Sequence, residues 1–265
     1  MARERYTHGH HESVLRSHEW RTIANSAAYL EPHLRPGVSL LDVGCGPGTI
    51  TAEFADRVAP DGSVLGIDAS SDVIALATEK QARPNLTFAV GDVYALDAAD
   101  DSYDIVHAHQ VLQHLGDPVA ALVEMRRVCR PGGVVAVREV DYPTTAIHPA
   151  TPELDEWLRL FSAATTENGG HPDAGRRLLS WVHAAGFTDV TPTASAWCFA
   201  TPEDRAWWGG MWADRITESA LADQAVAAGR ATRDDLNRIA DAWRAWMADD
   251  DAWFGVVHGE VIARA

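Results

Sequence analysis

Long apolar runs are missing from this chain, and cysteine is scarce. No stretch approaches the roughly 18 apolar residues of a membrane span, and residues 1–11 are polar and His-rich, without the apolar centre of a signal peptide. We therefore expect a cytoplasmic protein with no membrane partner. The three cysteines, Cys45, Cys129 and Cys198, match neither a disulfide framework nor a zinc knuckle, so buried reduced thiols are expected.

Positive charge is also scarce. The 22 basic residues stand against 38 acidic ones, the formal net charge is -16, and no cluster of Lys or Arg is present. Such a chain repels a polyanion over most of its surface, so nucleic acid is not an expected partner. His11 and Glu12 begin an H-E-x-x-H frame, but Leu15 stands where the second histidine belongs, and no metal is expected.

After Pro36 and Gly37, short apolar segments alternate with helical ones. This alternation predicts an α/β fold in which parallel strands are covered by helices on both faces. Residues 1–36 are expected to form an N-terminal helical arm, and residues 37–265 the main domain. The strands are expected at 38–43, 64–67, 86–90, 103–108 and 134–140, and the helices at 49–58, 72–80 and 118–129.

The second half of the chain is less regular and rich in tryptophan. Strands are expected at 187–199 and 253–263, helices at 153–166, 175–185 and 202–247, and helical cap segments near 151–168 and 202–249. Of the ten tryptophans, only Trp20 precedes Tyr142. An aromatic cap suits an apolar or aromatic small substrate, and the pocket candidates are Tyr142, Trp207, Trp208 and Trp212. The same tryptophans could equally fill the core of the cap or a homodimer interface.

Polar and glycine-rich segments follow three strands in succession. Gly44, Gly46 and Gly48 form a loop between a strand and a helix, where a ligand can approach the backbone and meet the unpaired N–H groups of the helix. Asp68 ends the next strand, and a carboxylate there can accept hydrogen bonds from both hydroxyls of a ribose. Asp92 follows the third strand. We interpret this set as a nucleoside site, although Asp68 could instead cap a helix and Asp92 could serve a turn.

These stretches resemble the motifs of class I S-adenosylmethionine (SAM)-dependent methyltransferases. LLDVGCGPGT at 40–49 looks like the first motif, GID at 66–68 the second and VGDV at 90–93 the third. YDIV at 103–106, VLQHL at 111–115 and RVCRPGG at 127–133 are similar to the later motifs. The likeness is greatest to the ubiquinone/menaquinone-type and small-molecule branch. It implies a Rossmann-like, mostly parallel sheet of seven strands, with 187–199 and 253–263 as candidates for the sixth strand and the antiparallel seventh.

The resemblance also implies which residues hold SAM. The glycine loop would face the methionine part and the ribose, Asp42 the positively charged end, Asp68 the ribose hydroxyls and Asp92 the adenine. The implied cofactor set is Asp42, Gly44, Cys45, Gly46, Thr49, Asp68, Ala69, Val73, Gly91, Asp92, Val93, Ala108 and His109, with Tyr6, His10, His11 and Arg21 as candidates in the arm.

NAD or NADP is the alternative cofactor. Its usual loop is G-x-G-x-x-G, which is sized for a pyrophosphate. Here the spacing is G-x-G-x-G, and Asp42 precedes the loop. SAM has no phosphate, and a carboxylate near its positive centre is favourable, so the sequence favours SAM.

Methyl transfer from SAM is an in-line displacement that depends mainly on alignment. A general base helps when the nucleophile is a neutral hydroxyl or amine. His109 and Asp141 are the main candidates, and Glu139 is a further one. His114 is a candidate for the substrate pocket or for packing. We expect methylation of an O, N or C atom of a small molecule, with S-adenosylhomocysteine (SAH) as product. The alternatives are a SAM-fold binding protein and a SAM-fold enzyme that transfers no methyl group.

Overall fold

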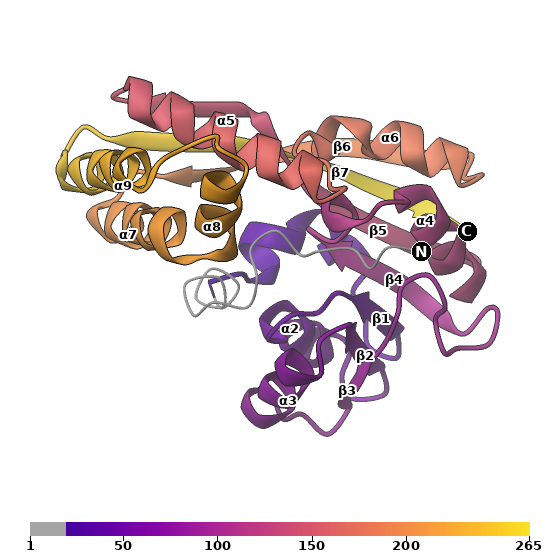
Figure 1. The fold of residues 1–265 in the computed structure, drawn as a ribbon. Helices are drawn as coiled ribbons and strands as arrows, with labels where there is room; N and C mark the ends of the chain where they lie inside the picture. Colours follow the sequence, from indigo (N-terminus) through magenta and orange to yellow (C-terminus); the bar gives the residue numbers. More distant parts are fainter. Residues whose placement is uncertain (1–19) are drawn as a thin grey trace.

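The computed structural model describes residues 20–265 (Figure 1). Its centre is a seven-stranded sheet in the order β3-β2-β1-β4-β5-β7-β6. Strands β1 to β5 are parallel to one another, and β7 is antiparallel to both β5 and β6. The predicted mostly parallel sheet of seven strands is therefore confirmed. The strands are β1 (Ser39–Val43), β2 (Ser63–Asp68), β3 (Leu86–Val90), β4 (Tyr103–His109), β5 (Cys129–His148), β6 (Asp189–Phe199) and β7 (Trp253–Arg264).

Apolar residues on alternate positions of the strands form one cluster on each face of the sheet, and a third cluster joins parts of β5, β6 and β7 to residues 154–164 and 208–246. Leu41 belongs to one cluster and Leu40 to the other, because successive side chains of a strand point to opposite faces. The first cluster packs under α4 (Pro118–Val128) and α6 (Ala174–Ala184), and the second under α2 (Thr49–Val58). Helix α3 (Ser71–Lys80) contacts β2 and β3. The helices thus cover both faces, as predicted.

The N-terminal arm was expected to be helical over residues 1–36, of which the structure describes residues 20–36. Two short helices occur there, the π-type η1 (Ile23–Ala27) and the 3-10 type η2 (Ala28–His33). Pro32 lies inside η2 and has no N–H to donate, which prevents a regular α-helix at this point. Ile23 and Leu30 pack into the same cluster as α2, so this segment is anchored to the sheet.

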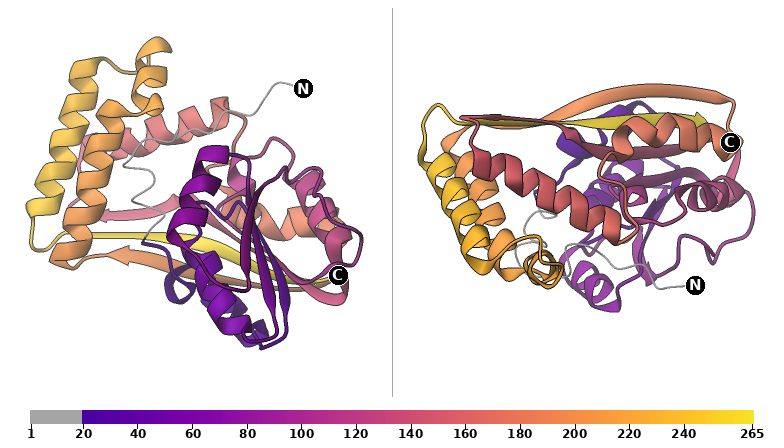
Figure 2. Two further views of the ribbon diagram at one scale, coloured as in Figure 1. Left: turned by 90° about the horizontal axis from the view of Figure 1, so that it is seen from below. Right: turned by 45° about the horizontal axis from the view of Figure 1, so that its top comes forward.

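Four helices form a lobe beside the sheet, and we call this lobe the cap. It consists of α5 (Pro152–Glu167), α7 (Pro202–Glu218), α8 (Ala220–Ala227) and α9 (Arg233–Ala248). The helix expected over 202–247 is therefore three helices. The first break comes at Ser219, whose extended backbone ends α7 and whose side chain accepts a hydrogen bond from the N–H of Leu221. The second break spans residues 228–232. In both views of Figure 2, α7 and α9 lie together at one end of the molecule.

Strand β5 is longer than expected and carries the cap. It was predicted to end at Val140, but it continues to His148. Its pairing with β7 is irregular between Asp141 and Ala146, and regular pairing then resumes through His148. The long ends of β5, β6 and β7 reach from the sheet to the helices of the cap (Figures 1 and 2).

Strand β5 also begins earlier than the expected residue 134, at Cys129. Cys129 already pairs with Tyr103, and the next regular pair is Val134 with Ile105. Four residues of β5 therefore stand against one of β4, and Gly132 has the positive φ of 77° that such an irregularity requires. Separately, no helix among residues 20–265 is long and apolar enough to cross a membrane.

Candidate functional site

A cavity of about 880 Å³ opens where the carboxyl ends of the parallel strands face the cap. Ligands of open α/β sheets bind at this edge, and the volume is within the range of small-molecule sites. We divide its lining into two parts. The strand-end half comprises residues 42–47, 49–50, 67–73 and 91–94 together with His107. The cap half comprises Arg21, residues 109–111 and 113–115, Tyr142, Trp197, Trp207, Trp208, Met211, Arg215 and Ala220.

The glycine loop forms the floor of the strand-end half. Gly44, Gly46 and Gly48 all have positive φ, at 67°, 56° and 78°, which side chains rarely tolerate. A Cβ on Gly44 would stand 2.3 Å from Val111 Cγ2, so the loop also needs glycine for space. Helix α2 begins at Thr49, directly after the loop, and directs the positive end of its dipole at the cavity.

Asp42 is fixed beneath this loop by two hydrogen bonds. Its Oδ1 accepts from His107 Nδ1 at 2.7 Å, and its Oδ2 accepts from Thr51 Oγ1 at 2.6 Å. Asp42 is 3% exposed and still lines the cavity, so a negative charge is held at a defined position. His107 carries no recognisable signal in the sequence. Its role follows from the register of β4 on β1, where His107 stands opposite Asp42.

Asp68 links the glycine loop to α3. Its Oδ2 accepts from the N–H of Gly46 at 3.2 Å, and its Oδ1 accepts from the N–H of Ser70 at 3.0 Å. The N-cap of α3 is Ser70, whose hydroxyl accepts from the N–H of Val73. The alternative that Asp68 is the helix cap is therefore wrong, and its carboxylate faces the cavity.

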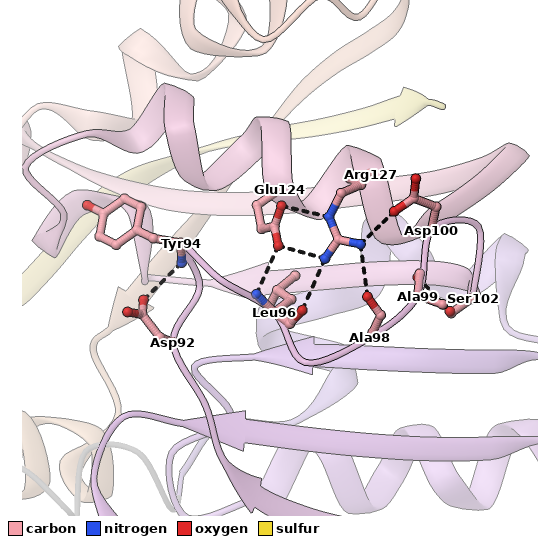
Figure 3. A network of polar contacts seen from close by, with 9 residues as sticks. All are labelled: Asp92, Tyr94, Leu96, Ala98, Ala99, Asp100, Ser102, Glu124 and Arg127. Carbon is pink, nitrogen blue, oxygen red and sulfur yellow. Dashed lines mark hydrogen bonds and ion pairs between the residues drawn. The ribbon is translucent and has the colours of Figure 1, made fainter.

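Asp92 begins the segment that connects β3 to β4. Its Oδ1 accepts from the N–H of Tyr94 at 2.9 Å, which is a turn interaction, and Asp92 and Val93 both line the cavity. Asp92 thus serves the turn and the cavity together. Figure 3 shows this contact at one end of a larger polar network.

Arg127 of α4 holds the rest of that segment in place. Its guanidinium donates to the carbonyls of Leu96 at 3.0 Å and Ala98 at 2.9 Å, and to Glu124 (Figure 3). Glu124 in turn accepts from the N–H of Leu96 at 2.9 Å. The arginine lowers the pKa of the Glu124 carboxyl. Helix α4 therefore fixes residues 96–98, the part of the segment that follows Asp92 and Tyr94.

His109, at the end of β4, is the buried titratable group of the cap half. It is 5% exposed and lines the cavity, and within residues 20–265 neither ring nitrogen has a hydrogen-bond partner. Burial, followed by the charge of Arg21, holds its pKa well below the usual value, so the imidazole is neutral. His114 also lines the cavity, and the same two causes lower its pKa to about 3.

Glu139 lies behind the cavity lining and holds the backbone of the segment that follows β4. Its Oε1 accepts from the N–H groups of Val111 and Leu112 at 2.9 and 2.8 Å, and its Oε2 accepts from that of Gln113 at 3.3 Å. Burial raises the pKa of this carboxyl to about 8. Glu139 is not part of the cavity lining, and its effect is to hold the segment after β4 that is.

Arg21 closes the cap half from the N-terminal side. Its guanidinium donates to Gln110 Oε1 at 2.8 Å and lies 5.6 Å from the centre of the Trp197 ring. Gln110 Nε2 lies 3.0 Å from His258 Nε2, and Gln110 has a φ of 55° that is rare outside glycine. Arg21 was among the arm candidates. Tyr6, His10 and His11 lie outside the described residues.

Most of the predicted site residues line the cavity. The structure brings together Asp42, Gly44, Cys45, Gly46, Thr49, Asp68, Ala69, Val73, Gly91, Asp92, Val93, His109, His114, Tyr142, Trp207 and Trp208. The lining also includes residues that the sequence analysis did not single out, namely Gln110, Gln113, Trp197, Met211 and Arg215. No local motif marks this second set, because its members converge only through the tertiary fold.

Three predicted site residues lie elsewhere. Asp141 accepts from Arg176 Nε and the N–H of Arg176, at 2.7 and 3.0 Å, so its carboxylate anchors the start of α6 and is no base in the cavity. Trp212 is fully buried in the cap, with its ring centre 4.6 Å from that of Trp157. Ala108 is fully buried in the sheet and does not reach the cavity surface.

Comparisons with known proteins agree with this arrangement. A sequence family described as a methyltransferase domain matches residues 34–186. Uncharacterized methyltransferase C1B3.06c of Schizosaccharomyces pombe is 35% identical over 97% of this chain and 95% of its own length. A demethylmenaquinone methyltransferase of Renibacterium salmoninarum is 30% identical over 68% of this chain and 77% of its own.

Among solved structures, a Haemonchus contortus phosphoethanolamine N-methyltransferase in complex with phosphomonomethylethanolamine and SAH has a TM-score of 0.58. It is 16% identical and the match covers 97% of this chain and 58% of that one. At this identity, the likeness concerns the fold.

Proposed function

This chain belongs to the class I SAM-dependent methyltransferases, and on that basis we propose that it methylates a small aromatic acceptor bound in the cap half of the cavity. The observation that carries the proposal is the composition of that half. Tyr142, Trp197, Trp207 and Trp208 line it, opposite the glycine loop, and the cavity is larger than a nucleoside alone requires.

The strand-end half fits SAM by the chemistry of its donors and acceptors. Asp68 offers carboxylate oxygens where a ribose would lie, and Asp92 and the N–H of Val93 suit an adenine edge. Asp42 provides a fixed negative charge for the cationic end of the molecule. When bound, SAM supplies a methyl group on a positively charged sulfur, which needs no further activation.

His109 is our candidate for the general base. It is neutral, it lines the cavity, and both of its ring nitrogens are available to a bound hydroxyl or amine. Asp141 is not a candidate for this role, because its carboxylate forms an ion pair with Arg176. Glu139 contributes by positioning, since it fixes the backbone directly after His109 and Gln110.

Calorimetric titration of the purified protein with SAM, SAH and NADH tests the cofactor half. We expect micromolar binding of the first two and none of NADH. Binding of NADH alone would contradict the proposal. Incubation with SAM and a panel of phenols, catechols and aromatic amines, followed by mass spectrometry, then tests whether an acceptor gains a methyl group.

The role of His109 is tested by His109→Gln, with His183→Gln as the matched control because His183 is exposed on α6. Loss of a general base lowers kcat by about 10²–10⁴-fold. Because the pKa of His109 is already well below its usual value, wild-type kcat should not fall between pH 7 and pH 6. If His109→Gln keeps full kcat, the base assignment is wrong and alignment alone explains the rate.

A further inference from the structure

Polar side chains line the cavity at the ends of four neighbouring strands, in the sheet order β3-β2-β1-β4. Asp92 follows β3, Asp68 ends β2, and Asp42 and His107 lie near the ends of β1 and β4. The proposed function assigns the adenine to Asp92 and the ribose to Asp68. The amino-acid end of SAM, which is the part that remains, therefore falls to Asp42 and His107.

His107 is held in one orientation by a carboxylate and a ring. Its side chain is 1% exposed, and its Nδ1 lies 2.7 Å from Oδ1 of Asp42, the residue opposite it on β1. The Phe54 ring of α2 stands nearly perpendicular to the imidazole, with 4.9 Å between ring centres. A carboxylate can only accept, so Nδ1 carries a hydrogen. In the neutral imidazole, Nε2 is then an acceptor.

Nε2 of His107 is buried, and within residues 20–265 it has no hydrogen-bond partner, although the residue lines the cavity. A buried polar atom without a partner costs free energy, and such an atom in a ligand cavity indicates a missing donor. Asp42 beside it already accepts from Thr51 through one oxygen and from His107 through the other. The lone pair of Nε2 is therefore an acceptor that none of the described side chains uses.

We propose that His107 binds the α-ammonium group of SAM through Nε2, with Asp42 behind it as the compensating charge. SAM offers hydrogen-bond donors at its adenine amino group, its ribose hydroxyls and its α-ammonium group, and the first two are assigned elsewhere. The hydrogen bond from Nδ1 to a carboxylate polarises the ring and makes Nε2 a stronger acceptor. This inference rests on the proposed function and adds a residue to its cofactor site.

The test measures the binding of four adenosine ligands by calorimetry. SAH has both the ammonium and the carboxylate group, its decarboxylated analogue has only the ammonium, its deaminated analogue has only the carboxylate, and methylthioadenosine has neither. The variant is His107→Asn, whose amide nitrogen can still donate to Asp42 but which has no acceptor at the place of Nε2. It should bind the two ammonium ligands about 10- to 100-fold more weakly, as expected for a hydrogen bond to a charged group. The affinities of the other two should stay within about twofold.

Two further variants accompany this comparison. His107→Gln places an amide oxygen near the position of Nε2 and should restore most of the affinity for the ammonium ligands. His183→Asn removes an exposed imidazole from α6, outside the cavity, and should leave all four affinities unchanged. If His107→Asn does not fold, His107→Gln and the wild-type protein carry the test. The wild type should bind SAH at least about tenfold more tightly than the deaminated analogue.

Three outcomes overturn the inference. An equal loss for all four ligands in His107→Asn would mean that the histidine only supports the fold. A loss confined to the carboxylate ligands would mean that a charged ring donates to that group instead. The third outcome is a wild-type protein that binds the deaminated analogue as tightly as SAH. In all three cases the proposed function stands as long as the wild type binds SAH. If the wild type binds none of the four ligands, the function itself fails, and the inference with it.

Discussion

The two halves of the cavity are built in different ways. The strand-end half comes mainly from one continuous stretch, residues 42–94, in which each loop follows a parallel strand directly. The cap half is formed by segments that are far apart in the sequence, namely Arg21, residues 109–111 and 113–115, Tyr142, Trp197, Trp207, Trp208, Met211, Arg215 and Ala220. The residues of the strand-end half are therefore close together in the sequence, whereas those of the cap half are brought together only by long-range contacts of the fold.

Substitution of Trp157 should give the largest effect, because it should destabilise the cap and leave the strand-end half intact. This fully buried residue of α5 lies 4.6 Å from Trp212 and 4.9 Å from Trp243 between ring centres, in the middle of the cap. Trp157→Ala should lower the free energy of unfolding by about 3–5 kcal/mol through loss of burial and a new cavity. Chemical denaturation measures this, and SAM affinity of the folded fraction should remain near wild type.

The control for that variant is Trp253→Ala, because Trp253 is 42% exposed. Its cost should be clearly smaller. A change of similar size in the two variants would mean that the cap is not organised around Trp157.

Gly44→Ala should distort the glycine loop of the strand-end half and so weaken SAM binding. The left-handed backbone costs an L residue about 1–2 kcal/mol, and the overlap with Val111 adds about 1–3 kcal/mol. Gly132→Ala shares the positive φ but meets nothing within 4 Å, so it isolates the backbone strain. Calorimetry should show a large loss of SAM affinity for Gly44→Ala alone. Equal losses in both variants would show that the contact with Val111 is unimportant.

Asp68→Ala tests the ribose contact within the same half. It should weaken SAM binding by about 1–3 kcal/mol, the cost of leaving buried hydroxyls without partners. Asp56→Ala removes an exposed carboxylate that pairs with Arg83 and serves as the control. Unchanged affinity in folded Asp68→Ala would remove the main argument for the position of the ribose.

Glu139→Gln should give the smallest effect, which should appear as a change in how Tm depends on pH. Because burial raises the pKa of this carboxyl to about 8, folding favours its protonated form. Its contribution to stability is therefore complete below the unfolded pKa, near 4.5, and is lost as the pH rises through about 8. Glutamine cannot ionise, so the Tm of the variant should fall less than that of the wild type between pH 6 and pH 9.

Parallel Tm curves for the two proteins would show that Glu139 is already ionised in the folded protein at pH 6, so that its pKa is not raised into this range. The His109→Gln variant provides a separate check, since its pH dependence should resemble that of the wild type in this assay.

The sequence predicted the strand-end half well because its signals are local. Helix α2 begins and ends where the pattern put it, and the glycine loop, Asp68 and Asp92 all line the cavity. The cap half was predicted only as a region rich in tryptophan. Nothing local distinguishes Trp208, which lines the cavity, from Trp212, four residues later on the same helix and buried in the cap.

Pairing between distant residues explains the remaining differences. Asp141 ends a regular stretch of β5 and resembles a catalytic carboxylate in sequence, but Arg176 engages it from α6. The extension of β5 to His148 was missed because its irregular pairing with β7 interrupts the apolar pattern near Tyr142. These features depend on partners that approach only in the folded protein.

Because β5, β7 and β6 continue into the cap, the cap half of the cavity rests on an extension of the sheet. Helices α5 and α6 are inserted between β5 and β6, and α7 to α9 between β6 and β7, so two connections carry the aromatic cap on a shared hydrogen-bonded support. Neither insertion interrupts residues 42–94, which carry most of the strand-end half. The fold thereby keeps the segments that would hold the methyl donor separate in sequence from most of those that form the proposed acceptor site.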